Sequence, residues 1–179
     1  MDYILPFDVE KYGVHILQGY HGPYSHFDHE ERYGVLNDQS YAVDFILPLG
    51  TEIFSSRGGC VIGFYTISNT FYEGIDVYIG NNLPSFSTNF LVIMHDDDSC
   101  ALYSHLWRQS ERVVFGQRVE PGIVLAHSGK SGWIGPNPHL HFAVYRYVER
   151  SNRRNKIITE PASFRNYHGP LEHAALTFL

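Results

Sequence analysis

The 179-residue sequence lacks the features that define several large classes of protein. No apolar run reaches the ~18 residues that a membrane-spanning helix needs, so we expect no insertion into a membrane. Basic residues number 13 against 19 acidic ones, and the resulting net charge of −6 argues against a general affinity for nucleic acid or an anionic membrane. Apolar residues make up 44% of the chain, which excludes a disordered polymer.

The sequence also has only two cysteines, and its first residues do not have the pattern of an export signal. The two cysteines, Cys60 and Cys100, lie in or beside strand-like runs, and we expect them to be small buried thiols rather than a disulfide. The N-terminal segment carries Asp2, Asp8 and Glu10 where an export signal would be basic and then apolar. We therefore expect no export signal in this sequence.

Helical periodicity is nearly absent, and only Leu106–Glu111 and Pro161–Asn166 show a weak helical pattern. Glycine and proline interrupt the chain at short intervals, and the runs between them are rich in β-branched and aromatic residues. This pattern predicts a mainly β protein with an antiparallel, sandwich-like sheet in a single domain over residues 1–179. The expected strands are Tyr41–Phe45, Glu52–Ser55, Gly59–Tyr65, Ile75–Ile79, Phe90–Met94, Ala101–Leu106, Ile123–His127 and His139–Tyr147.

Two segments are predicted to be loops. Ser68–Asn89 is a long excursion rich in Asn, Ser, Gly and Pro, and long loops in compact domains often line binding sites. Arg146–Lys156 holds five of the 13 basic residues. We interpret it as a solvated loop between strands, with contact to an anionic substrate or polymer as the alternative.

Histidine is abundant, with 11 copies, and it is both the commonest metal ligand and a good acid–base group at neutral pH. In the run Pro138-His139-Leu140-His141-Phe142, strand alternation places both histidines on one face and their apolar neighbours on the other. The two imidazoles can then act at one site, although two polar residues on a solvated face would give the same pattern.

Three further residues join this pair as candidates. Tyr103 and His105 are expected to share a face at the end of a strand, and a lone histidine there would more often be structural. Asp44 lies among apolar residues, where a carboxylate needs a cationic partner, a turn to cap or a metal. We favour the metal. His26 is a plausible further ligand, with His21 and His29 as rivals.

Two histidines and one aspartate suit a tetrahedral Zn²⁺ whose fourth position is left for water, the pattern of a catalytic zinc site. Zinc lowers the pKa of its water to about 7, which supplies a nucleophile near neutral pH. Two further histidines would serve as base, acid or oxyanion stabiliser.

These residues, in this order, resemble the lysostaphin-type (LytM-like) zinc metalloendopeptidases, which cut peptide cross-links of bacterial cell walls. The resemblance covers about residues 20–145. The matching blocks after Ser25-His26 are YAVDFILPLGTEIFSSRGGCVIGF, LVIMHDDDSCALYSHL, VVFGQRVEPGIVLAHSGKSG and GPNPHLHFAV. Many members have their first histidine three residues before the aspartate, whereas 17 residues separate His26 from Asp44 here. Some relatives carry a long insertion after a Ser-His pair.

The resemblance implies a role for each candidate. Zinc ligands would be His26, Asp44 and His141, and the non-ligand catalytic histidines would be His105 and His139. The site would lie in a groove walled by long loops. Candidates for substrate contact are Tyr72, Trp107 and Trp133, whose alternative is that of ordinary, partly buried aromatics.

The resemblance also implies a substrate and a place. The substrate would be a peptide stem or cross-bridge of peptidoglycan, in the periplasm, at the cell wall or outside the cell. Residues 1–19 would be an N-terminal extension and residues 146–179 a C-terminal segment. Apart from the resemblance, the segment Met1–Tyr20 could be an edge strand or could cover the groove.

Three other interpretations of the sequence each require a feature that this chain does not show. A catalytically silent LytM-like module that binds or regulates cell-wall enzymes would have lost some of the five side chains, which are all present here. A cupin needs a glutamate shortly after His-x-His, and this chain has Tyr145 and Arg146 there. A D-alanyl-D-alanine carboxypeptidase or hedgehog-type site closes with Trp-His, a dipeptide that this sequence lacks.

Overall fold

The computed structural model describes residues 2–30, 35–73, 87–135, 137–149 and 155–172. Within these ranges the chain is mainly β and its strands pair mostly antiparallel, which confirms the predicted fold class. The elements are β1 (Asp2–Tyr3), α1 (Val9–Tyr12), β2 (Ile16–Gln18), β3 (Val43–Ile46), β4 (Glu52–Phe54), β5 (Gly59–Tyr65), β6 (Phe71–Tyr72), β7 (Phe90–Met94), β8 (Cys100–Ser104), β9 (Arg118–Val119), β10 (Val124–His127), β11 (Gly132–Trp133), β12 (His139–Glu149), β13 (Asn155–Glu160) and β14 (Ser163–Phe164).

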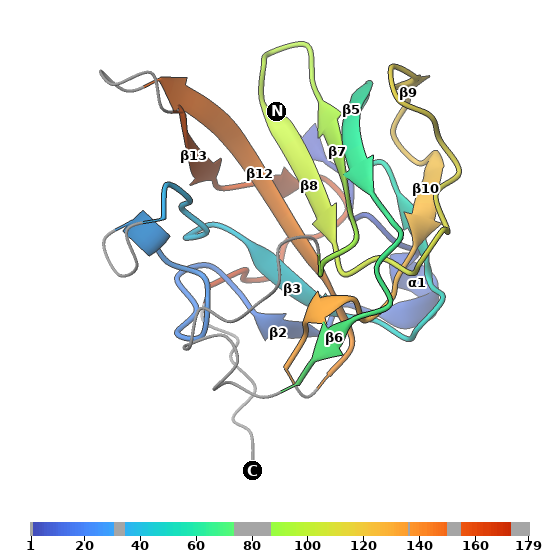
Figure 1. Cartoon of the computed structure of the whole chain (residues 1–179), viewed down its shortest axis with the longest axis horizontal. Coiled ribbons are helices and arrows are strands. Elements are labelled where there is room, and N and C mark those ends of the chain that lie inside the picture. Colours follow the sequence, from blue (N-terminus) through green and yellow to red (C-terminus); the bar gives the residue numbers. More distant parts are fainter. Residues whose placement is uncertain (1, 31–34, 74–86, 136, 150–154, 173–179) are drawn as a thin grey trace.

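Eight of the described strands form one sheet in the order β2-β3-β12-β8-β7-β5-β9, with β13 added beside β12. The long strand β12 runs through the middle of the molecule, with β3 and β2 on one side and β8, β7 and β5 on the other (Figure 1). Its first half pairs with β3 and its second half with β13, while β8 follows the other edge. The start of β12 therefore lies between β3 and the end of β8.

One face of this central region packs into the hydrophobic core. Phe45 of β3, Tyr103 of β8 and Phe142 of β12 point to that face and are at most 1% exposed. The rings of Tyr103 and Phe142 meet edge to face with centroids 5.4 Å apart. Because successive side chains of a strand point to opposite faces, the core packing of Phe45 and Phe142 directs their neighbours Asp44 and His141 to the other face.

Most of the predicted strands are confirmed, with ends that differ by one or two residues. Gly59–Tyr65 and Phe90–Met94 form as predicted, and the predicted strand at His139 extends to Glu149. The strand predicted from Tyr41 starts at Val43, and the one predicted over Ala101–Leu106 is Cys100–Ser104. The prediction for Ile75–Ile79 lies outside the described residues.

Both helix predictions are wrong, because the backbone of each segment bonds to distant segments. In Leu106–Glu111, Trp107 donates its N–H to His127 and Gln109 donates to Thr66. In Pro161–Asn166, β14 pairs with β1 and Arg165 donates to the carbonyl of Tyr3. Among the described residues, the helix α1 is capped by the Asp8 carboxylate, which accepts from the N–H groups of Glu10 and Lys11.

Two strands of the main sheet arise from segments at the ends of the chain. The N-terminal segment supplies β2, the edge strand beside β3. The C-terminal segment supplies β13, which pairs with β12 over Val144–Glu149. Of the two alternatives for the N-terminal segment, the structure therefore shows an edge strand.

The two cysteines are free. Cys60 of β5 and Cys100 of β8 both pair with Met94, so the strand β7 separates them. Two strand spacings amount to roughly 9.5 Å, which exceeds the ~7 Å that a disulfide can bridge between Cα atoms. Cys100 is buried and Cys60 is partly buried, in line with the expectation of unpaired thiols.

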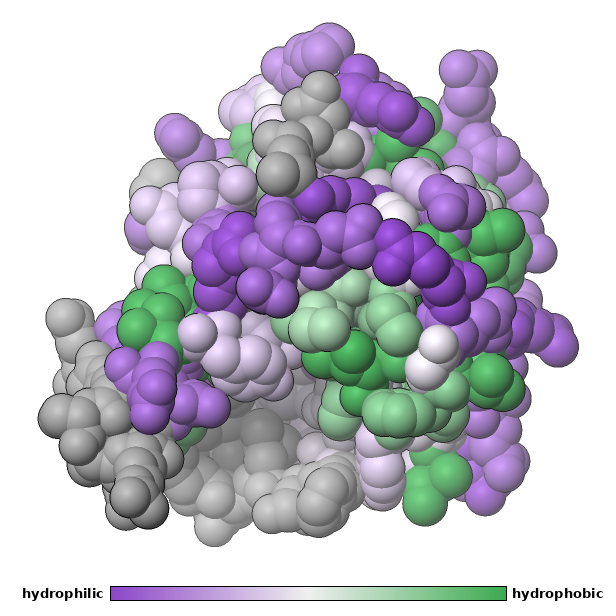
Figure 2. Space-filling view, turned by 90° about the horizontal axis from the view of Figure 1, so that it is seen from above, coloured by the Kyte–Doolittle hydropathy of each residue, from purple (hydrophilic) through white to green (hydrophobic). Residues whose placement is uncertain are grey.

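The basic segment is less solvated than predicted. The Lys156 side chain is only 6% exposed and forms ion pairs with Asp28 and Glu30, while Arg146 pairs with Glu160 and Asp97. On the face shown in Figure 2, hydrophilic residues predominate and hydrophobic ones gather in separate patches. No helix among the described residues has the length and apolar character needed to span a membrane.

Candidate metal centre

Several residues of the candidate centre lie in a row across adjacent strands. Asp44 of β3 lies directly opposite His141 of β12, and His141 lies opposite Ser104 of β8. On its other side Asp44 lies opposite Gln18 of β2. Directly opposed residues in a sheet point to the same face, so the register itself gathers these polar side chains.

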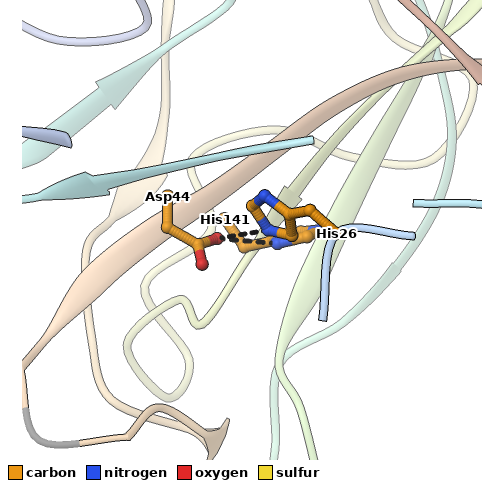
Figure 3. A group of neighbouring side chains, drawn as sticks. All are labelled: His26, Asp44 and His141. Carbon is orange, nitrogen blue, oxygen red and sulfur yellow. Dashed lines mark hydrogen bonds and ion pairs between the residues drawn. The ribbon is translucent and has the colours of Figure 1, made fainter. Parts of the chain in front are cut away.

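His26 reaches this row from the loop between β2 and β3. Its Nε2 lies 3.3 Å from Asp44 Oδ1, and the Nδ1 of His141 lies 2.8 Å from the same oxygen (Figure 3). Ligand atoms of these three residues all lie within 4.8 Å of one another. His26 is fully buried, Asp44 is 3% exposed and His141 is partly buried.

The outer nitrogen of each histidine is held by a carbonyl oxygen. His26 Nδ1 lies 2.8 Å from the backbone carbonyl of Gly19, and His141 Nε2 lies 3.0 Å from the side-chain carbonyl of Gln39. A neutral imidazole that donates through its outer nitrogen keeps a lone pair on the inner one. Both inner lone pairs then face the Asp44 carboxylate, and the buried Nε2 of His26 has no hydrogen-bond partner. This donor set fits a divalent cation.

The charge states also suit a metal site. Burial opposes ionisation of Asp44, but His26, His139 and His141 around the carboxylate outweigh it and hold the pKa of Asp44 well below its usual value. Burial lowers the pKa of His141, although Asp44 opposes that shift. At neutral pH the aspartate is therefore charged and His141 is neutral, the states in which each binds a metal.

His105 and His139 lie beside the three residues. Their ring centroids are 4.6 Å apart, and His139 Nε2 lies 3.7 Å from Asp44 Oδ1. His139 Nδ1 lies 2.9 Å from the carbonyl of Asn137 and His105 Nδ1 lies 2.7 Å from that of Ser131, so each ring is oriented by a backbone carbonyl. Burial and the neighbouring histidines lower the pKa of His105 to about 3.

The orientation of His105 differs from the sequence prediction. Tyr103 points into the core, and strand alternation would send His105 there as well. His105 instead has a φ of 64°, in the left-handed region that non-glycine residues seldom adopt. The strand ends at Ser104, and the turn directs the His105 ring to the face of His139 and His141.

A family model described as peptidase family M23 matches residues 38–155. The chain belongs to peptidase family M23. His26 and β2 lie before the matched region, whereas Asp44, His105, His139 and His141 lie within it. A comparison with curated proteins gives no match.

Solved structures show the same fold at low identity. A zinc-containing peptidase from Vibrio cholerae has a TM-score of 0.53 at 23% identity over 89% of this chain and 39% of its own. A second match is a mutant form of the catalytic domain of EnpA, a prophage-encoded M23 protein from Enterococcus faecalis. Its TM-score is 0.51 at 18% identity, over 87% of this chain and 92% of its own. For the antimicrobial peptidase lysostaphin from Staphylococcus simulans, the TM-score is 0.51 at 20% identity, over 88% of this chain and 51% of its own. This chain thus spans about two fifths of the Vibrio protein.

A cavity of about 250 Å³ lies in front of the histidines of this M23 chain. His105, His141 and Trp133 line it, together with Gln39 and His29 from the insertion between His26 and Asp44. The structure thus brings Trp133 into the site.

The other two aromatic candidates lie elsewhere. Tyr72 of β6 is paired with Trp133 of β11 in a parallel ladder and is not among the residues that line this cavity. Trp107 is 48% exposed and lines a separate cavity with Phe71, Arg108 and Lys130.

Sequence reasoning missed the two glutamines that contact the centre. Gln18 donates to Asp44 Oδ2 over 3.2 Å, and Gln39 accepts from His141. Neither belongs to a motif of the M23 resemblance. Only the strand register, which places Gln18 opposite Asp44, identifies the first of them.

Proposed function

We propose that this M23 chain is a zinc-dependent endopeptidase that hydrolyses peptide bonds in the stem or cross-bridge peptides of peptidoglycan. The convergence of His26, Asp44 and His141 around one point, with two more oriented histidines beside them, is the observation that carries the proposal. Membership of the family and the fold of a zinc-containing peptidase and of lysostaphin support it.

The residues would divide the work as follows. Bound zinc would supply a Lewis acid and would lower the pKa of a water to about 7. His26, Asp44 and His141 would hold the ion. Of His105 and His139, one would accept a proton from the attacking water and the other would stabilise the oxyanion of the scissile carbonyl. Because the Nδ1 of each ring is held by a backbone carbonyl, each turns Nε2 toward the site: an unprotonated Nε2 would serve as the base, and a protonated Nε2 would donate to the oxyanion. Trp133 forms part of the wall against which an extended peptide would lie.

Metal content is the first test. Protein purified without chelator or nickel affinity should contain about one zinc per chain by elemental analysis, and His141→Ala should lose it. The exposed His168 supplies a matched control, since His168→Ala should retain the metal. A parent chain without zinc that takes up none on addition would contradict the proposal and favour a binding module.

Turnover is the second test. On a panel of peptidoglycan peptides that the parent cleaves, His105→Ala should keep its zinc and lose about 10²–10⁴-fold in kcat, the range of general acid–base catalysis. Full turnover of every cleavable peptide by this variant would remove His105 from the mechanism. A zinc-loaded parent that cleaves no peptide and no intact peptidoglycan would identify the silent, regulatory alternative.

A further inference from the structure

Gln18 is a buried polar residue whose hydrogen bonds all go to the neighbourhood of the candidate centre. It is 2% exposed. Its Nε2 donates to Asp44 Oδ2 over 3.2 Å and to Ser25 Oγ over 2.9 Å. Its Oε1 accepts from the backbone N–H groups of Tyr24 and Ser25, at 2.7 and 3.0 Å. The amide thus connects the carboxylate of Asp44 to the turn that carries His26.

A bulge in β2 places Gln18 there. Ile16 pairs with Phe45 and Gln18 pairs with Asp44, so the register shifts between the two. Phe45 points into the core and Asp44 to the opposite face. In a regular strand Ile16 and Gln18 would share a face, whereas the extra residue lets Ile16 pack in the core while Gln18 reaches the carboxylate. Bulges near active sites commonly redirect a side chain in this way.

The loop beside Gln18 approaches it closely at a glycine. A Cβ on Gly22 would lie 2.1 Å from Gln18 Cγ and 2.7 Å from its Cδ, so a side chain at this position would displace the Gln18 side chain. The loop, the bulge and the amide therefore fit one another closely.

We propose that Gln18 is a positioning residue for the metal centre and that it orients two of the three ligands, Asp44 and His26. By donating to Oδ2 it fixes the Asp44 carboxylate with Oδ1 toward His26 and His141, and by accepting from Tyr24 and Ser25 it fixes the approach of His26. Hydrogen-bond partners of metal ligands typically change metal affinity by about 10–100-fold when they are removed. This inference rests on the proposed zinc site, and it makes β2, which precedes the region matched by the family model, part of that site.

Two variants separate the two halves of the proposal. Gln18→Ala removes both the donor and the acceptor. Gln18→Glu keeps oxygens that accept from Tyr24 and Ser25, but it removes the donor to Asp44 and adds a second carboxylate beside it. Gln117→Ala is the matched control: Gln117 Oε1 accepts from the N–H of Val114 in a turn beside β9, the strand at the opposite edge of the sheet from β2.

The experiment measures the zinc dissociation constant of each full-length chain by competition with a chromophoric chelator, after circular dichroism has verified folding. We expect both Gln18 variants to bind zinc about 10–100-fold more weakly than the parent, with Gln117→Ala within about twofold of it. The visible spectrum of the Co²⁺-loaded Gln18→Glu chain should also differ from that of the parent.

The outcomes are distinct. If Gln18 has a purely structural role, its variants should unfold at a lower temperature with an unchanged zinc dissociation constant. That result for Gln18→Glu would overturn the inference about Gln18 and leave the proposed function standing. If Gln18→Ala does not fold, Gln18→Glu decides, because it retains the acceptor to the loop. A parent chain that binds no zinc would overturn the proposed function, and this inference with it.

Discussion

His105 is buried, has an uncommon backbone conformation and lies beside two other histidines. Its φ of 64° directs the ring into the site, and its burial keeps the imidazole neutral, with a pKa of about 3. The depressed pKa means that the ring is neutral at neutral pH and keeps a lone pair that can accept a proton. The same features cost stability in acid, because the folded chain resists protonation of a group that the unfolded chain protonates readily.

The stability of the zinc-free protein should therefore depend on pH through His105. Its folded pKa of about 3 lies below the ordinary value of 6.5, so the unfolded state binds the proton first. The stabilisation is fully present above pH ~6.5 and is lost as pH falls toward the folded pKa, with a slope approaching about 1.4 kcal/mol per pH unit. Urea unfolding of the chelator-treated chain between about pH 7 and pH 5, the upper part of that window, would measure the slope.

His105→Gln is the comparison for this measurement, because glutamine is neutral throughout and can still donate to the carbonyl of Ser131. Its unfolding free energy should fall less steeply with decreasing pH than that of the parent. Equal slopes for the two proteins would show that His105 does not resist protonation in the folded chain.

At the scale of the elements, the insertion between His26 and Asp44 is attached to the sheet by β13. The carbonyl of Ile157 accepts from the N–H of Asp38, and the buried ammonium of Lys156 pairs with Asp28 and Glu30. The insertion in turn carries Gln39 and His29, which line the cavity in front of the histidines. The strand β13 thus anchors the insertion that forms one wall of the cavity.

Removal of the Lys156 charge should loosen that attachment. Lys156→Met takes away the cation that the carboxylates of Asp28 and Glu30 share, and we expect a loss of roughly 1–3 kcal/mol in the free energy of unfolding. Arg118→Met is the control, because its ion pair with Asp96 is exposed to solvent and should contribute little to stability. Chemical denaturation of both variants tests this, and similar losses in the two would mean that Lys156 does not anchor the insertion.

The sequence predicted the elements that depend on local pattern. Strand alternation placed His139 and His141 on one face, and the pairing of both with Asp44 Oδ1 agrees with it. It failed for His105, because a left-handed turn breaks the alternation one residue after the strand ends. It could not find Gln18, because the bulge that directs this residue depends on how β2 pairs with β3, and pairing is set by the packing of distant segments.

At the scale of the whole molecule, the centre joins parts of the chain that are far apart in sequence. One row of side chains links β2, β3, β12 and β8, and His26 is added from a loop. None of these parts forms the site alone, and unfolding disperses all of them. Because an unfolded chain cannot hold the three ligands together, zinc should bind the folded state alone and stabilise the whole fold.

This linkage gives a prediction that needs no substrate. At a free zinc concentration about 100 times the dissociation constant, the free energy of unfolding should rise by about 2.7 kcal/mol, which for a chain of this size corresponds to roughly 5–10 °C in Tm. Differential scanning calorimetry of the chelator-treated parent with increasing zinc measures it. His141→Ala should shift far less and His105→Ala should shift like the parent, because only the first lacks a ligand. A shift of equal size in both variants would place the stabilising ion outside the His26–Asp44–His141 centre, since a site elsewhere would be indifferent to either substitution.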